Sequence, residues 1–262
     1  MNQPYWLKQD EKALFPDLLW ARPELKSAAG KLLIVGGHAQ SFAAVAEAYA
    51  AAEKAGIGSV RVLLPDCLEK TIGKLFPAAE FAPSNPSGGF AMQALAEVLA
   101  AGQWAGGTLI AGDLGRNSET TAMLENFAGK YTGQLTITKD AADFFCSQSH
   151  GIISRASTLL VLSMGQLQKL GHSLKLPSAF TSDLGTVQLV ELLHDLTSMY
   201  PNLHLIIRNQ NHDVVAVAGH ISTTPASTDK PIWRVTTAAS AATWWLQNPT
   251  KAFEAITTTL VS

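Results

Sequence analysis

The sequence has little charge of either sign and no excess of positive charge. Its 262 residues include 19 lysines and arginines against 21 aspartates and glutamates, which gives a formal net charge of −2. Proteins that bind nucleic acid or anionic membranes need a basic surface excess, so we expect neither partner. Charged residues make up only 15% of the chain and hydrophobic residues 47%, and this balance excludes a disordered chain.

Cysteines and long apolar runs are also scarce. The only two cysteines, Cys67 and Cys146, are expected to be free thiols, because disulfide frameworks belong mainly to small secreted domains. Residues 1–12 are polar and mixed in charge, unlike the apolar core of a secretory signal. No apolar run reaches the roughly 18 residues of a membrane span. We therefore expect a cytoplasmic protein.

Short apolar runs alternate with longer helical segments along the chain. Strands are expected at 31–35, 59–64, 108–111, 134–138, 158–162, 203–208, 214–218 and 232–235. Helices are expected at 42–55, 68–75, 89–101, 119–130 (capped by Ser118), 140–146, from the caps 181–183 to about 200, and at 238–247 and 251–260.

This alternation predicts an α/β fold. Repeated strand–helix units favour parallel strands with helices on both faces of the sheet. The turn-rich segment NQNHD lies between two strands and predicts an antiparallel hairpin. The expectation is a three-layer α/β/α sandwich whose mostly parallel central sheet has an antiparallel hairpin at one edge. No linker or repeat divides the chain, so residues 1–262 are expected to form one domain, with 1–28 as an N-terminal extension packed on it.

Two glycine clusters follow expected strands, where open α/β sheets bind ligands. Gly36-Gly37 ends the first strand, and the segment AGDLGR contains Gly112, Gly115 and Arg116. Glycines there let the backbone approach a phosphate, and a following helix offers its positive N-terminus. The dinucleotide fingerprint G-x-G-x-x-G is absent, so tight turns explain the glycines as well as a ligand site does. Arg116 is either a phosphate ligand or a solvated loop residue.

Several segments resemble the ADP/ATP-dependent NAD(P)H-hydrate dehydratases, a ribokinase-like family. The segment LLIVGGHAQSFAAVAEAYAAAEKAGIGSVRVLLP (32–65) resembles the opening of these enzymes. AGDLGR (111–116) is similar to their G-P-G-L-G-R loop, and ITKDAADFF (137–145) to their L-D-A-D-A-L segment. LVLSMGQLQKLG (160–171) resembles T-P-H-P-G-E-x-x-R-L-L-G. The resemblance runs in order over residues 32–219.

The resemblance implies a function and a set of ligands. The family repairs hydrated NADH and NADPH by eliminating water while consuming ADP or ATP, as a carbon–oxygen lyase, on a ribokinase-like fold. It implies that Gly36 and Gly37 approach the dinucleotide, with Gly112, Gly115 and Arg116 on the opposite wall and Arg208 near a phosphate. The family's habit also implies a homo-oligomer, which the low charge and the pair Trp244-Trp245, expected to have one core-facing and one interface-facing ring, support.

The sequence departs from the family where catalysis takes place. The family's Gly-Thr-Gly-Asp turn, which opens the penultimate helix, supplies an anion hole and a base, but the corresponding segment TTAASAA (236–242) has neither glycine nor aspartate. Asp113 replaces the middle glycine of the G-P-G-L-G loop. Asp183, Asp213 and Asp229 are expected in caps and turns, so no catalytic residue is assigned.

The departures predict weak or lost dehydratase activity on a retained scaffold. A non-catalytic protein that binds a nucleotide or metabolite, or acts in assembly, is the alternative. A small-molecule kinase of the ribokinase type is a third possibility, and it would need the same turn. The seven histidines show no metal-ligand spacing, so no metal site is expected.

Overall fold

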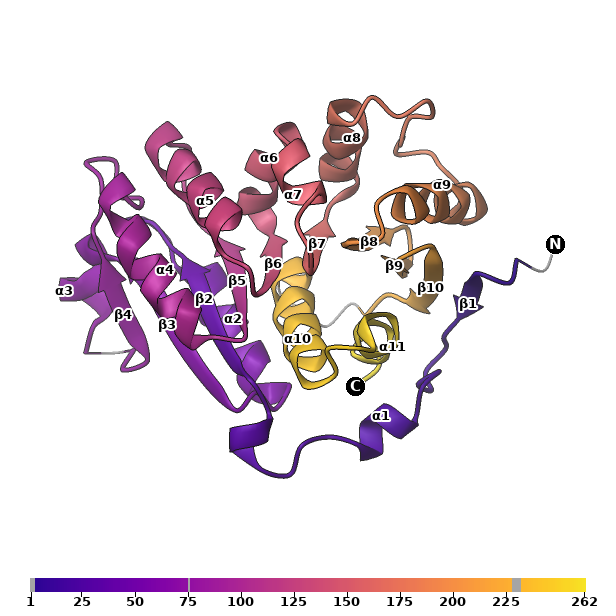
Figure 1. Ribbon diagram of the computed structural model, residues 1–262, viewed down its shortest axis with the longest axis horizontal. Coiled ribbons are helices and arrows are strands. Elements are labelled where there is room, and N and C mark those ends of the chain that lie inside the picture. Colours follow the sequence, from indigo (N-terminus) through magenta and orange to yellow (C-terminus); the bar gives the residue numbers. More distant parts are fainter. Residues whose placement is uncertain (1–2, 75, 228–231) are drawn as a thin grey trace.

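The computed structural model describes residues 3–74, 76–227 and 232–262, which form one ten-stranded sheet covered by helices (Figure 1). The strands are β1 (Trp6–Lys8), β2 (Lys31–Gly36), β3 (Ser59–Pro65), β4 (Ala79–Ala82), β5 (Gly107–Gly112), β6 (Gln134–Thr138), β7 (Thr158–Leu162), β8 (Leu203–Asn209), β9 (His212–Val217) and β10 (His220–Pro225). The α-helices are α1 (Asp17–Trp20), α2 (Ala43–Lys54), α3 (Glu69–Ile72), α4 (Leu95–Trp104), α5 (Ser118–Lys130), α6 (Lys139–Ser147), α7 (His150–Ile153), α8 (Met164–Ser173), α9 (Thr186–Met199), α10 (Trp233–Gln247) and α11 (Ala252–Thr258).

The sheet is mostly parallel. Its order is β1-β10-β9-β8-β7-β6-β5-β2-β3-β4, and the strands from β8 to β4 all run in the same direction. The expected hairpin is β8–β9, with Ile206 opposite Val215. The sheet continues beyond it, because β10 pairs antiparallel with β9 and β1 pairs parallel with β10. The three-layer α/β/α architecture predicted from the sequence is confirmed.

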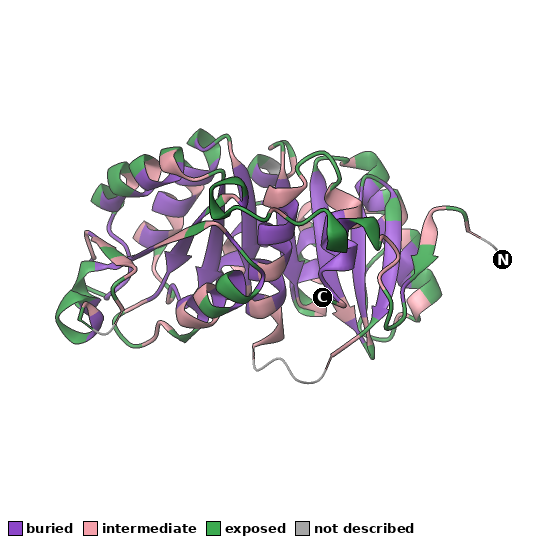
Figure 2. Cartoon of the chain, turned by 90° about the horizontal axis from the view of Figure 1, so that it is seen from below, coloured by how far each residue is buried: buried purple, intermediate pink, exposed green. Residues whose placement is uncertain are grey.

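Helices cover both faces of the sheet. On β2, Leu33 and Val35 pack with the core under α4 to α9, whereas Leu32 and Ile34 pack with the core under α2, α3, α10 and α11. All four side chains are fully buried, and Figure 2 shows the strands as the buried centre of the molecule. Burial on both faces explains why this strand is a continuous apolar run.

Several elements differ from the sequence-based expectations. Residues 232–235 are not a strand: α10 begins at Trp233, five residues before the expected start at Ala238. The last strand is β10, and it was missed because its sequence HISTTP is largely polar. The short strands β1 and β4 were also missed. The expected helix 68–75 is shorter, since α3 ends at Ile72, and residue 75 lies outside the described residues.

The N-terminal segment crosses the face that carries α10 and α11 (Figure 1). Beyond β1, the buried side chain of Gln9 donates to Oγ1 of Thr224 (3.1 Å) and to the carbonyl of Thr257 (2.8 Å). The guanidinium of Arg22 donates to the carbonyl of Ala55 and lies 4.9 Å from the ring centre of Trp244. The segment is therefore attached to β10, α11, α2 and α10.

Both tryptophans of the Trp244-Trp245 pair are buried, with 1% and 3% of their surfaces exposed. Trp244 packs with Leu18 of the N-terminal segment, and Trp245 packs in the core beneath α10. The expectation of one interface-facing ring is therefore wrong. The tryptophan that faces solvent is Trp20, which is 88% exposed.

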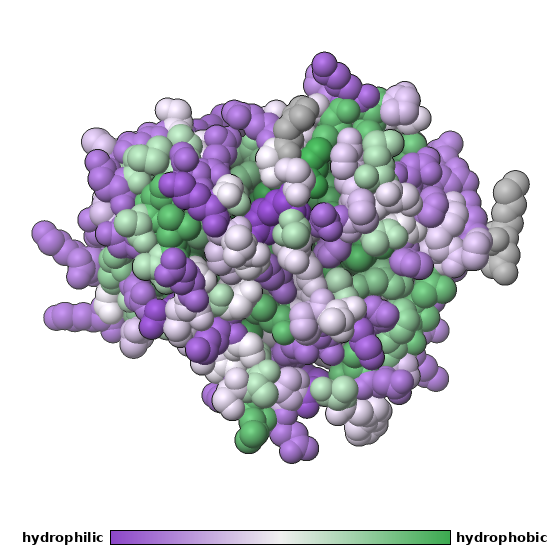
Figure 3. All heavy atoms as spheres, in the orientation of Figure 1, coloured by the Kyte–Doolittle hydropathy of each residue, from purple (hydrophilic) through white to green (hydrophobic). Residues whose placement is uncertain are grey.

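On the face drawn in Figure 3, hydrophobic side chains form several groups among hydrophilic ones. No helix among the residues with a described structure is long and apolar enough to cross a membrane.

Candidate functional site

The predicted glycines lie together at the carboxyl edge of the sheet. Gly36 of β2 pairs with Gly112 of β5, and the N–H of Gly37 donates to the carbonyl of Gly112 (3.0 Å). A Cβ on Gly36 would lie 2.5 Å from that carbonyl oxygen, so a larger residue would force the strand ends apart. Gly115 has φ +69°, and a Cβ there would lie 2.7 Å from the ring of His38. Close packing of the chain on itself therefore accounts for these glycines.

Asp113 binds the beginning of α2. Its Oδ2 accepts hydrogen bonds from the N–H of Ala44 (2.8 Å) and from Oγ of Ser41 (2.9 Å), and its Oδ1 forms an ion pair with Nζ of Lys139. Desolvation would raise the pKa of this buried carboxyl, but these hydrogen bonds outweigh it, so the pKa lies below its ordinary value. Asp113 is therefore ionised at neutral pH and fully partnered within the chain.

Asp140 holds the loop that carries Asp113. Its two carboxylate oxygens accept the N–H groups of Asp113 and Leu114, each at 2.8 Å. Asp113 and Lys139 both have left-handed backbones, with φ of 57° and 55°. Such conformations are costly for residues other than glycine, and here the ion pair and the Asp140 contacts hold them in place.

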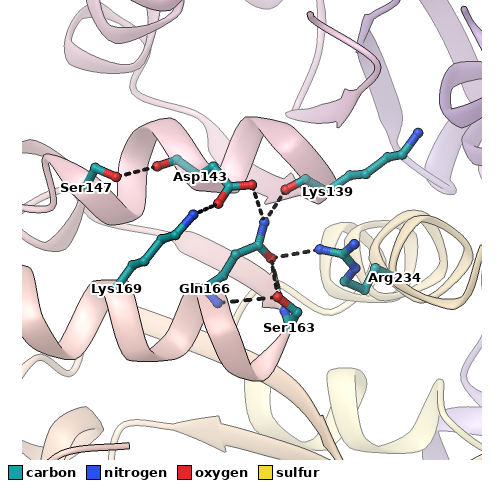
Figure 4. Close-up of polar contacts among 7 residues, drawn as sticks. All are labelled: Lys139, Asp143, Ser147, Ser163, Gln166, Lys169 and Arg234. Carbon is teal, nitrogen blue, oxygen red and sulfur yellow. Dashed lines mark hydrogen bonds and ion pairs between the residues drawn. The ribbon is translucent and has the colours of Figure 1, made fainter. Parts of the chain in front are cut away.

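Gln166 is the centre of a second polar cluster, between α6, α8 and α10 (Figure 4). Its amide donates to Oδ2 of Asp143 (3.0 Å) and to the carbonyl of Lys139 (2.5 Å), and its Oε1 accepts from Nη1 of Arg234 (2.8 Å). Asp143 also pairs with Lys169. Lys139 joins this cluster only through its backbone, because its side chain extends away from Gln166 (Figure 4).

Arg234 is the residue that the sequence analysis missed. It lies in the first turn of α10, half-buried, and its guanidinium forms no ion pair with a carboxylate among the described residues. Burial lowers the pKa of Arg234, and the charges of Asp143 and Asp140 oppose this only in part. Little in the sequence pointed to Arg234, because it precedes the segment 236–242 that was aligned with the family's catalytic turn.

Arg208 and Arg116 differ in their surroundings. Arg208 makes a two-point ion pair with Asp213 across the β8–β9 hairpin (Nε–Oδ1 2.7 Å, Nη2–Oδ2 2.9 Å) and stacks 4.4 Å from the ring centre of Trp233. It therefore lies beside the start of α10 with its guanidinium engaged. Arg116 is exposed on the loop after β5.

The turn that opens α10 is Ile232–Val235 rather than the segment 236–242, which lies inside the helix. This turn contains neither glycine nor carboxylate. Of the acidic residues considered in the sequence, Asp183 is exposed, Asp213 is paired with Arg208, and Asp229 lies outside the described residues. The carboxylate found beside α10 is Glu47 of α2, whose Oε1 accepts from Oγ1 of Thr236 (3.1 Å).

Metal-ligating side chains and cysteines are dispersed over the described part of the chain. Across residues 3–74, 76–227 and 232–262, no three His, Cys, Asp or Glu side chains gather in a way that could hold a metal ion. Both cysteines are free: Cys67 is exposed and Cys146 is buried, and burial raises the pKa of the Cys146 thiol to about 12.

Comparison with known proteins identifies the fold. No protein-family model and no curated protein matches the sequence. Among solved structures, a ribokinase-like superfamily protein from Enterococcus faecalis superposes with a TM-score of 0.76 at 15% identity, covering 100% of this chain and 87% of that one. The ADP/ATP-dependent NAD(P)H-hydrate dehydratase of Bacillus subtilis, crystallised with ATP and Mg²⁺, gives 0.63 at 12% identity, covering 91% and 79%.

Pyridoxal kinase from Bacillus subtilis, in an ADP complex, gives a TM-score of 0.58 at 9% identity, covering 88% of each chain. These likenesses lie at low sequence identity and establish the fold. The chain has the ribokinase-like fold, as the resemblance in its sequence implied, and its structural neighbours include a hydrate dehydratase and a kinase.

Proposed function

We propose that the chain binds a nucleotide at the carboxyl edge of the sheet, near β7 and β8, and does not turn it over as a dehydratase or kinase would. The phosphates would lie at the first turn of α10, beside Arg234. The observation that carries the proposal is the half-buried Arg234 guanidinium, which has no carboxylate ion-pair partner among the described residues. A guanidinium is well suited to bind phosphate oxygens, and a helix N-terminus favours negative charge.

The structural neighbours support a nucleotide as the ligand. The hydrate dehydratase of Bacillus subtilis was crystallised with ATP and Mg²⁺, and the pyridoxal kinase with ADP. ADP or ATP is therefore the first ligand class to test, with hydrated NAD(P)H as the second.

The absence of turnover is inferred from the partners of the carboxylates. Asp113, Asp143 and Asp213 are each paired with a cation, and Asp140 accepts two backbone N–H groups. A general base must be free to take a proton from a hydroxyl group, and its loss typically costs about 10²–10⁴ in rate.

Calorimetric titration tests the binding. ADP, ATP and NADPH should be titrated into the wild type, Arg234→Met and the control Arg61→Met. Arg61 lies on β3, away from α10, where it pairs with Glu80 and stacks 4.4 Å from the ring centre of Trp104. Arg234→Met should weaken ADP binding about tenfold or more, because a hydrogen bond to a charged group contributes roughly 1.5–3 kcal/mol. Equal ADP affinities in all three proteins, or no binding to the wild type, would contradict the proposal.

An assay for recovery of NADPH from its hydrate tests the proposed absence of dehydratase turnover. We expect no turnover above the rate without protein. Turnover near that of an ordinary enzyme would show that a base exists, and Glu47 would be the first residue to replace, because its described side-chain partner is a hydroxyl group.

A further inference from the structure

Three donors from different parts of the chain converge on the Asp113 carboxylate. The N–H of Ala44 comes from the first turn of α2, the hydroxyl of Ser41 from the loop before this helix, and the ammonium of Lys139 from the first residue of α6. A helix N–H, a hydroxyl and an ammonium are together a donor set that suits a phosphate. Here a carboxylate of the chain itself takes all three.

The arrangement holds Asp113 firmly in this position. The residue is only 9% exposed, and its own N–H is fixed by Asp140 (2.8 Å). The residue before α2, Phe42, makes no side-chain capping hydrogen bond, and Asp113, in the loop after β5, caps the helix instead. The left-handed backbones of Asp113 and Lys139 persist because the ion pair and the cap support them.

We propose that Asp113 determines which ligands can bind at the carboxyl edge of the sheet beside β2 and β5. Its carboxylate occupies the three donors, and it thereby excludes anionic groups from this part of the edge. A ligand that reaches this end must be neutral or cationic at that point. The proposal deepens the proposed function and rests on it only for the ligand bound at α10. The phosphates of a bound nucleotide would therefore lie only beside Arg234, at the start of α10.

Inorganic phosphate is the probe that tests this inference. Wild type, Asp113→Gly and Asp113→Asn should be compared by thermal unfolding over a phosphate series at constant ionic strength, and by calorimetric titration. We expect both variants to bind phosphate at least tenfold more tightly than the wild type, with a saturable rise in melting temperature. Asp113→Asn keeps an oxygen that can accept from Ala44 and releases the ammonium of Lys139 from its ion pair, so this variant tests the inference if Asp113→Gly does not fold.

Glu80→Gln is the matched control. It also removes a carboxylate from a cation, Arg61 (Nε–Oε1 3.2 Å), but both side chains are exposed and the pair lies on β3 and β4, outside the Asp113 and Arg234 contacts. We expect no gain in phosphate affinity in this variant, and we expect Asp113→Asn combined with Lys139→Met to lose most of the gain.

Two outcomes would overturn the inference: Asp113 variants that bind phosphate no better than the wild type, or an equal gain in Glu80→Gln. Failure of the proposed function is measured separately, by ADP on the wild type. If ADP fails to bind while Asp113→Asn gains phosphate, nucleotide binding is refuted and the role of Asp113 stands.

Discussion

His204 is a buried histidine on β8, beneath α10. Its ring lies 4.8 Å from the ring centre of Trp245, and its Nδ1 has no hydrogen-bond partner among the described residues. Desolvation lowers its pKa from 6.5 to about 4, a shift that the hydrogen bond to the Leu203 backbone opposes only in part. The imidazole is therefore neutral in the folded protein at pH values where the unfolded chain is already protonated.

This difference makes stability depend on pH. The unfolded chain binds more protons between pH 6.5 and 4, so the free energy of unfolding falls as the pH decreases through this window. Between pH 7 and pH 5 the loss from His204 is about 2 kcal/mol. Urea unfolding at both pH values should show a smaller loss in His204→Phe than in the wild type. The exposed His172→Gln should retain the wild-type dependence, and an unchanged dependence in His204→Phe would refute this cause.

Asn117 is the N-cap residue of α5. The sequence suggested Ser118 as the cap of α5, but the structure places Asn117 there, with Oδ1 accepting from the N–H groups of Glu119 (2.8 Å) and Thr120 (3.2 Å). The same side chain donates to Ser87 (2.9 Å), which ties α5 to the loop before α4.

Substitutions of Asn117 and of its neighbour Ser118 are therefore expected to have different effects on stability. Asn117→Ala should lower the free energy of unfolding by about 1–2 kcal/mol, since it loses the cap and the contact to Ser87. Ser118→Ala should change it by less than about 0.5 kcal/mol. Urea unfolding of both variants measures this, and equal losses would show that Asn117 does not act as the cap.

The elements differ in how well their sequences predict them. The bounds of 134–138 and 158–162 were predicted correctly, because QLTIT and TLLVL consist mainly of β-branched and apolar residues, which favour strands. β1 pairs with a strand 215 positions further along the chain, and nothing in its short sequence marks it as a strand. β10 forms a hairpin with β9, but its sequence HISTTP is largely polar and does not resemble a buried strand. α10 was placed too late because its first turn, Ile232–Val235, contains a tryptophan and β-branched residues that favour strands.

The candidate site was predictable only where local conformation determined it. Gly37, Gly112 and Gly115 have left-handed φ values, and glycine marks such turns in a sequence. The ion pair of Asp113 with Lys139 and the contact of Gln166 with Arg234 join residues 26 and 68 positions apart. Only the order of the strands brings these side chains together, so no local pattern reveals them.

The N-terminal segment belongs to the cooperative structure of the whole molecule. Gln9 joins it to β10 and α11, and its Oε1 also accepts the N–H of Leu14 (3.1 Å). Gln9→Leu leaves buried polar groups without partners, so it should lower the free energy of unfolding by at least about 2 kcal/mol. Urea unfolding measures the loss, with the exposed Lys12→Gln as the control. Unchanged global stability, with the segment alone loosened in hydrogen exchange, would refute this coupling.

Homo-oligomerisation stays a prediction. The two tryptophans that supported it in the sequence are buried inside the chain, while Trp20 and Leu25 of the N-terminal segment are 88% and 70% exposed. Sedimentation of the wild type and of Trp20→Ser would test whether these side chains lie in an interface.

The pairing of β1 with β10 also has a consequence for synthesis of the protein. Trp6 pairs with Ile221, which is 215 positions further along the chain. At about 5–20 residues per second, a ribosome needs roughly 10–40 s to make the intervening chain. Throughout that time β1 has no partner in the sheet. β1 is therefore among the last strands to reach its native position, and chaperones that bind nascent chains have long access to it.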